Sequence, residues 1–205
     1  CSIFNEKLIK SKFLIKKKND PINDLKSIKN NTEIKNMIEA HIKDGVAVTK
    51  FLYWIKNSNI RKLDEIKVEK KLESFRKQSK NYLFPSFSTI AGSGPNGAII
   101  HYRSNKKSNR KLNKDHLLLV DSGGQYKWGT TDITRTISFS DPSKKTKELY
   151  TRVLKGHIAV AMSKIDKLKN GNNIDKLARK SLNSINLDYR HGTGHGVGFF
   201  MNVHE

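Results

Sequence analysis

Two aspartates are the first residues of this sequence whose types and spacing could do chemistry. Asp121 directly follows the apolar run LLLV, a costly place for an unpaired charge, and Asp132 opens the β-branched run ITRTI. A hairpin could bring the two carboxylates opposite each other across a ladder, where their repulsion would raise one pKa. A bound cation would remove this repulsion, and hard carboxylate oxygens suit Mn²⁺, Mg²⁺ or Ca²⁺.

The segment HGTGHGVGFFMNVHE, residues 191–205, supplies imidazoles in the form of His191, His195 and His204. Glycines around the first two histidines would let the backbone approach closely. Adding imidazole to carboxylate ligands moves the metal preference towards Mn, Fe, Co or Zn, and two ions that share carboxylates can provide a hydroxide for hydrolysis at neutral pH. The structural alternative stays open, because a lone Asp in a turn is usually a cap and a lone His is usually a surface or core residue.

The elements that must position these residues are a mixture of helices and strands. Apolar residues recur at helical spacing over 32–57, namely Ile34, Met37, Ile38, Ile42, Val46, Phe51, Leu52 and Ile55. Asn30 and Glu33 are placed to form a capping box before this helix. A second helix is expected over 66–78, with Ile66, Leu72 and Phe75 inward. For both helices we expect ordinary core packing.

Strands are expected over 98–102, over 116–126 with a break at residues 122–124, and over 130–140, where β-branched residues alternate. A long helix should then run from Asp141, as N-cap before Pro142, to about Ile165. A further amphipathic helix is expected over 172–184, and an extended Gly-rich tail from Tyr189. Hairpin-like strands mixed with helices predict an α+β fold with a largely antiparallel sheet.

Composition narrows the class of protein. The 205 residues carry a formal charge of +21, but the lysines are spread along the chain with Asn and Ile, so a coding bias explains them better than a nucleic-acid surface. Cys1 is the single cysteine, which excludes an internal disulfide and fits a reducing cytoplasm. No apolar run is long enough to span a bilayer, and no signal peptide is visible.

Three stretches resemble Xaa-Pro aminopeptidase, also called aminopeptidase P, of the pita-bread metallopeptidase family. They are GPNGAIIHY (94–102), LLLVDSGGQYKWGTTDITRTISF (117–139) and HGTGHGVGFFMNVHE (191–205). The helix AHIKDGVAVTKFLYWI (40–55) fits as well, so the resemblance begins near Ile34. It implies the pita-bread fold, a curved and largely antiparallel sheet flanked by helices, with residues 1–30 as a linker or remnant of a preceding domain and 31–205 as a partial metallopeptidase domain.

The resemblance also implies a role for each site residue. Asp121 would bind one divalent ion, Asp132 would bridge two, and His195 would bind the other. The ions would typically be manganese. Three histidines would line the substrate pocket and stabilise the tetrahedral intermediate: His101, His191 and His204. The reaction would release the N-terminal residue from peptides with proline second, since a tertiary prolyl amide calls for a dedicated site.

The family's metal site uses five protein ligands, and two are glutamates downstream of the last histidine motif. Glu205 matches the position just after the pocket histidine, so it does not replace either glutamate. We therefore expect a fragment that is inactive alone and starts at a fragment boundary at Cys1, or a chain completed in trans by a separately encoded C-terminal piece. The third hypothesis is a non-catalytic basic homologue that binds nucleic acid or protein.

Overall fold

The computed structural model describes residues 2–16, 18–164, 166, 170–200 and 202–205, so Cys1 and Ile165 lie outside the described residues. The α-helices are α1 (Ile3–Lys10), α2 (Pro21–Ser27), α3 (Asn31–Lys56), α4 (Glu65–Arg76), α5 (Lys144–Ala161) and α7 (Gly171–Asn183). Two 3₁₀ helices are η1 (Ile60–Lys62) and η2 (Gly94–Ala98). The strands are β1 (Tyr82–Pro85), β2 (Ile90–Ser93), β3 (Leu118–Ser122), β4 (Gly124–Tyr126), β5 (Gly129–Thr130) and β6 (Ile133–Ile137).

The strands form two three-stranded sheets, with orders β2-β3-β6 and β1-β4-β5, and all their pairings are antiparallel. This confirms the predicted α+β class and its antiparallel strands. The break expected at residues 122–124 is where the chain leaves the first sheet at Ser122 and enters the second at Gly124. Gly123 permits the crossing, because a Cβ atom there would lie 1.9 Å from the Thr131 carbonyl oxygen.

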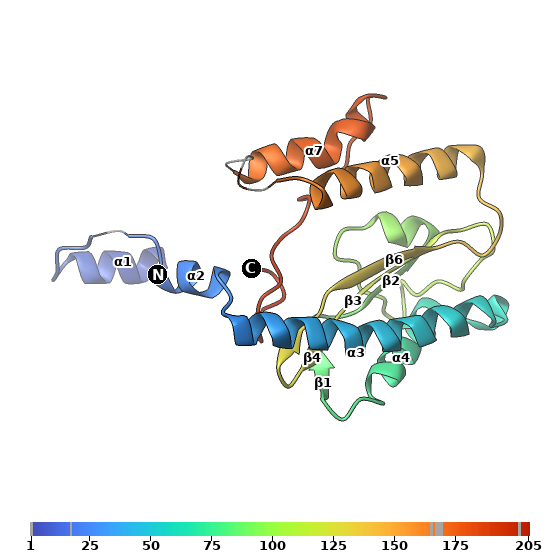
Figure 1. The fold of residues 1–205 in the computed structure, drawn as a ribbon, viewed down its shortest axis with the longest axis horizontal. Coiled ribbons are helices and arrows are strands. Elements are labelled where there is room, and N and C mark those ends of the chain that lie inside the picture. The colour runs from blue at the N-terminus through green and yellow to red at the C-terminus, as the bar shows by residue number, and fades with distance from the viewer. Residues whose placement is uncertain (1, 17, 165, 167–169, 201) are drawn as a thin grey trace.

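The core lies between helices α3 and α4 and the β2-β3-β6 sheet. Figure 1 shows α3 along one side of the strands, with the α5–α7 pair on the other side and α1 and α2 projecting away from the body. The buried core residues come from both helices, all three strands and one loop: Val48, Phe51, Ile55, Val68, Leu72, Ala91, Leu112, Leu118, Val120 and Ile137. None of the described helices combines the length and the apolar character that a membrane-spanning segment requires.

Helix α3 has the predicted bounds to within a residue, and the capping box of Asn30 and Glu33 is present. Its buried face, however, is partly different from the one the apolar spacing indicated. Before Phe51, Ile34, Ile38, Ile42 and Val46 are between 47% and 58% exposed, and the buried residues are Ala40, Asp44, Ala47 and Val48. Small side chains win here because Gly129 packs directly against the helix, where a Cβ atom would lie 2.7 Å from that of Ala40.

Two other expectations are wrong. No strand forms over 98–102, because β2 ends at Ser93 and a 3₁₀ helix and a turn follow. Helix α5 is capped by Ser143, whose Oγ accepts from the Thr146 amide, while Asp141 instead pairs with Lys147. Residues 1–30, expected as a linker or remnant of a preceding domain, contain two short helices that bury no residue. The second amphipathic helix, α7, lies within a residue of its predicted place.

Two glycines inside helices predict opposite effects on stability. In α5, a Cβ atom on Gly156 would lie 2.1 Å from the Ala178 carbonyl oxygen of α7, whereas a Cβ atom on Gly45 in α3 would meet nothing within 4 Å. We expect Gly156→Ala to lower the free energy of unfolding by about 1–3 kcal/mol through overpacking. The matched Gly45→Ala should raise it by about 0.5–1 kcal/mol through helix propensity. Urea unfolding measures both, and a stabilising Gly156→Ala would contradict the close helix contact.

Candidate functional site

All six residues singled out in the sequence line one pocket, about 470 Å³ in volume. They are His101, Asp121, Asp132, His191, His195 and His204. Asp121 comes from β3, Asp132 from the residue before β6, and His101 from the turn after η2. The other three come from the C-terminal segment, which begins more than fifty positions after Asp132. The tertiary structure therefore gathers in one place what the sequence holds in three separate stretches.

The two aspartates are neighbours, but they are not directly opposite each other as the hairpin argument supposed. Asp121 is paired across the ladder with Thr134, whose Oγ1 donates a 2.7 Å hydrogen bond to the Asp121 carboxylate. Asp132 lies two residues earlier, beyond the last ladder pair of Ser122 with Ile133. The offset arises because the chain crosses between the two sheets after Ser122, so the ladder ends before it reaches Asp132.

The pKa of Asp132 is raised, first by burial of its carboxyl group and then by the nearby charge of Asp121. His195 acts in the opposite direction, because its Nε2 lies 3.3 Å from Asp132 Oδ2. The repulsion between the two carboxylates, expected from the sequence, is therefore present in the fold. A cation between them would offset it, and the imidazole beside Asp132 adds a nitrogen donor to the same side of the pocket.

Three of the four histidine rings lie near one another, and the fourth, His191, packs against a different residue. His204 lies edge-on to His195, with ring centroids 4.2 Å apart, and its centroid is 6.1 Å from that of His101. His191 instead stacks on Tyr189, with centroids 4.7 Å apart. The Nδ1 atoms of His191 and His195 lie 2.8 and 2.6 Å from the carbonyl oxygens of Gly192 and Gly196. A carbonyl only accepts, so these contacts favour a proton on Nδ1 of each ring, and the Nε2 of His195 faces the Asp132 carboxylate.

The C-terminal segment folds back on itself instead of remaining extended. Gly196 and Glu205 exchange two backbone hydrogen bonds of 3.0 Å, and Val197 bridges His204. Gly198 makes this reversal possible, because a Cβ atom there would lie 1.8 Å from the Asn202 carbonyl oxygen. The glycines next to His191 and His195 do not all have the expected role, since Gly192 and Gly194 have open space where a Cβ atom would be.

A buried carboxylate that sequence reasoning missed holds the turn that carries His101. Glu65, fully buried at the start of α4, accepts hydrogen bonds from the Tyr102 hydroxyl at 2.7 Å and from the Asn96 amide group at 3.0 Å. Glu65 also accepts from the Ser93 backbone at 2.7 Å. His101 has a φ of 54°, a left-handed conformation that side chains rarely adopt, so its neighbours must hold it in place.

Arg179 of α7, also missed, holds the segment that carries His191. Its guanidinium pairs with Asp175 and Asp188, at 2.8 Å each, and donates to the carbonyl oxygens of Tyr189 at 2.6 Å and His191 at 2.8 Å. It also lies 4.0 Å from the centroid of the Tyr189 ring, a cation–π contact. The helical spacing of Asp175 and Arg179 signals their ion pair, but nothing local signals the contacts to the segment beyond α7.

The carboxylates and imidazole in the pocket are suitable ligands for divalent ions, although they do not form a complete coordination site. Among the described residues, no three His, Cys, Asp or Glu side chains converge closely enough to hold an ion by themselves. The pocket nevertheless gathers two adjacent carboxylates and an imidazole whose Nε2 lies 3.3 Å from Asp132 Oδ2, which are oxygen and nitrogen donors suited to Mn, Fe, Co or Zn. The crowding of two carboxylates is itself the feature that a cation would relieve.

Comparison with known proteins decides the family. Residues 35–205 match the sequence profile of metallopeptidase family M24. The chain belongs to this family. A probable Xaa-Pro aminopeptidase P of Paracoccidioides brasiliensis is 46% identical over 188 residues, which cover 90% of this chain and 30% of the relative. The Xaa-Pro aminopeptidase of Drosophila melanogaster is 48% identical over 187 residues, with the same two shares. The chain thus spans about 30% of the length of these curated relatives.

Solved structures give the same family and the fold. An X-prolyl aminopeptidase of Caenorhabditis elegans, described as a cytosolic enzyme with a di-nuclear active site, superposes with a TM-score of 0.83 at 35% identity. That match covers 91% of this chain and 31% of the other. The prolidase of Pyrococcus furiosus has a TM-score of 0.79 at 27% identity, covering 100% of this chain and 59% of the other. This M24 chain therefore has the pita-bread type of fold that the resemblance implied.

The Arg179 contacts predict how firmly the M24 chain holds its histidine segment. We expect Arg179→Ala to free residues 189–193, because one guanidinium supplies both carbonyl contacts and the cation–π contact there. Backbone amide order parameters from NMR relaxation should fall from about 0.85 to below about 0.6 in that segment. Arg190→Ala is the control, since it removes one positive charge from the same segment without those contacts. Unchanged order parameters in Arg179→Ala would show that the segment is held by something else.

Proposed function

We propose that this M24 chain carries the active-site pocket of an Xaa-Pro aminopeptidase, which releases the N-terminal residue from peptides with proline second. The observation that supports this most is the single pocket shared by the two aspartates and four histidines, in a chain 46–48% identical to Xaa-Pro aminopeptidases. The relatives named above are peptidases throughout, so the comparisons favour this function over a non-catalytic basic homologue.

In this proposal Asp121, Asp132 and His195 hold two divalent metal ions, with manganese as the expected metal. The adjacent carboxylates and the Nε2 of His195, which lies beside Asp132, support the assignment, as does the di-nuclear site described for the Caenorhabditis elegans enzyme. When bound, the ions would supply water activated for hydrolysis at neutral pH. The protein's contribution is to hold the two carboxylates together despite their repulsion and to present the imidazole in the right tautomer.

The remaining histidines act on the peptide. His101 and His204 line the pocket, with His204 against the His195 ring, so they can donate hydrogen bonds to the scissile carbonyl as its oxygen gains charge. His191 holds Nδ1 against the Gly192 carbonyl, so its Nε2 is the ring nitrogen left for the peptide. A prolyl amide has no N–H to offer, so these histidines must bind its carbonyl and flanking groups instead.

The place of this activity is proposed to be the cytoplasm. The Caenorhabditis elegans relative is described as a cytosolic enzyme, and a single cysteine is compatible with a reducing compartment.

Metal binding tests the ligand assignment directly. We expect Mn²⁺ to broaden the NMR signals of the His195 and His204 rings in a saturable manner. Asp132→Asn should weaken this binding beyond the ~100-fold that loss of an outer hydrogen-bond partner typically causes, because it removes the shared ligand. Asp115→Asn makes the same charge change in a loop outside the pocket, so it should leave the binding curve unchanged. Equal loss in both variants would mean that Mn²⁺ binds through general charge only.

Peptide cleavage tests the function. The resemblance implies two further glutamate ligands that residues 1–205 do not include, so this polypeptide with Mn²⁺ alone should cleave an Ala-Pro peptide negligibly. Addition of the segment of the Drosophila melanogaster relative that carries those glutamates should restore cleavage by complementation in trans. Hydrolysis of Ala-Pro-Ala and of Ala-Ala-Ala, followed by released alanine, gives the readout. Full turnover by residues 1–205 alone would contradict the need for the glutamates, and complementation without preference for proline would contradict the substrate.

A further inference from the structure

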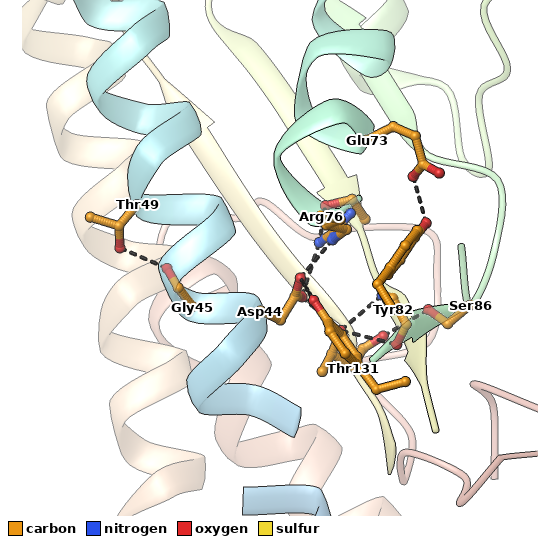
Figure 2. Close-up of polar contacts among 11 residues, drawn as sticks. Asp44, Gly45, Thr49, Glu73, Arg76, Tyr82, Ser86 and Thr131 are labelled. Atoms are coloured by element: carbon orange, nitrogen blue, oxygen red, sulfur yellow. Dashed lines mark hydrogen bonds and ion pairs between the residues drawn. The ribbon is translucent and has the colours of Figure 1, made fainter. Parts of the chain in front are cut away.

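The pocket of the two aspartates has a fully buried ion pair behind it. Asp44 of α3 and Arg76 at the end of α4 are both 0% exposed, and their side chains meet in two contacts. Arg76 Nε donates to Asp44 Oδ1 at 2.6 Å, and Arg76 Nη2 donates to Asp44 Oδ2 at 3.0 Å. Figure 2 shows the two side chains pointing towards each other from their helices. Such a two-pronged contact fixes direction as well as distance.

Each residue of the ion pair also forms a hydrogen bond with a residue that is next to one site aspartate in the sequence. Asp44 Oδ2 accepts a 2.6 Å hydrogen bond from Thr131 Oγ1, and Thr131 is the residue immediately before Asp132. Figure 2 shows Thr131 next to Asp44. Thr131 is itself held in both directions, because its amide donates to the Gly124 carbonyl at 2.9 Å and its Oγ1 accepts from the Gly124 amide at 2.8 Å. The position of Asp132 is therefore tied to Asp44 through one covalent step.

The other member reaches Asp121 in the same way. Arg76 Nη2 donates to Ser122 Oγ at 3.1 Å, and Ser122 immediately follows Asp121 in β3. Side chains alternate along a strand, and in β3 the buried residues are Leu118, Val120 and Ser122. Ser122 therefore points into the interior while Asp121 faces the pocket. Through these hydrogen bonds the ion pair holds the chain next to both site aspartates, from the side of the sheet opposite the site.

We propose that the Asp44–Arg76 pair sets the separation of the two site carboxylates, so that both residues are positioning residues for the metal site. A buried ion pair can often be replaced by apolar residues without loss of stability, so stability alone does not explain its presence here. Apolar packing, however, would not hold Thr131 and Ser122 by directional hydrogen bonds. The inference rests on the proposed function, because it assigns the network a role towards ions held by Asp121 and Asp132.

The test compares variants that each remove one hydroxyl group. The hydroxyls differ in whether the residue that carries them is next to one of the site aspartates. Thr131→Val removes the hydroxyl that joins Asp44 to the Asp132 segment, and Ser122→Ala removes the one that joins Arg76 to the Asp121 segment. Tyr126→Phe removes a third hydrogen bond to the same pair, 3.0 Å from Asp44 Oδ1, from a residue that adjoins neither aspartate. Thr49→Val makes the same Thr-to-Val change on α3, where the hydroxyl donates to the Gly45 carbonyl, as Figure 2 shows.

The readout is the Mn²⁺ dissociation constant of the full 205-residue chain, measured by paramagnetic broadening of the His195 ring, alongside the urea midpoint of the metal-free protein. We expect Thr131→Val and Ser122→Ala each to weaken Mn²⁺ binding about tenfold, the lower end for an outer-shell partner. Thr131→Ser, which keeps the hydroxyl, should restore binding. Tyr126→Phe should lower the urea midpoint, as Thr131→Val does, while leaving the dissociation constant within twofold, and Thr49→Val should change neither.

Different results would contradict the proposed metal site and the proposed positioning role. If the unaltered chain shows no saturable Mn²⁺ binding that depends on Asp132, the proposed metal site fails and the positioning role fails with it. If the chain binds Mn²⁺ but Thr131→Val and Tyr126→Phe affect binding equally, the ion pair serves the fold alone. Circular dichroism confirms that each variant folds, and if Thr131→Val does not, the milder Ser122→Ala carries the same comparison.

Discussion

The buried ion pair between Asp44 and Arg76 is the interaction on which the arrangement of helices and sheets depends. It joins α3 to α4, and through Ser122 and Tyr126 it contacts the β2-β3-β6 and β1-β4-β5 sheets. The two oxygens of Asp44 accept four hydrogen bonds, so the charge removed from water is well compensated. Loss of one partner of such a pair typically costs about 3–5 kcal/mol, because a bare charge stays buried. Both helices and the β1-β4-β5 sheet must be in place before the Asp44 carboxylate has all these partners.

Helix α4 therefore serves as a platform behind the candidate site. It begins at Glu65, which holds the turn of His101, and it ends at Arg76, which holds Ser122 next to Asp121. Between these buried charged residues its apolar side, with Val68 and Leu72, packs into the core. One rigid element thus fixes two parts of the pocket relative to each other, as a metal centre with a positioned electrophile requires.

The third part of the pocket is held differently. The segment of His191, His195 and His204 depends on Arg179, on its own backbone hydrogen bonds and on the contact of Glu205 with Lys29, and most of these groups are in contact with solvent. Water competes for such contacts, so they contribute less than buried ones. The two aspartates of the pocket are therefore held rigidly, whereas the histidines of the C-terminal segment are held more weakly. These three histidines are the groups that would have to adapt to a peptide.

Contiguous motifs and periodicities over a few residues were enough to predict the family, the α+β class, the strands around Asp121 and Asp132, and the six pocket residues. The buried face of α3 could not be predicted in this way, because apolar residues lie on several sides of that helix and Gly129 selects the small ones. The partners of Asp44 and Glu65 could not be predicted either, since they are distant in sequence and only the folded chain brings them within hydrogen-bonding distance. For Arg179, helical spacing indicated the pair with Asp175, but the contacts with the segment after α7 depend on how that segment folds back.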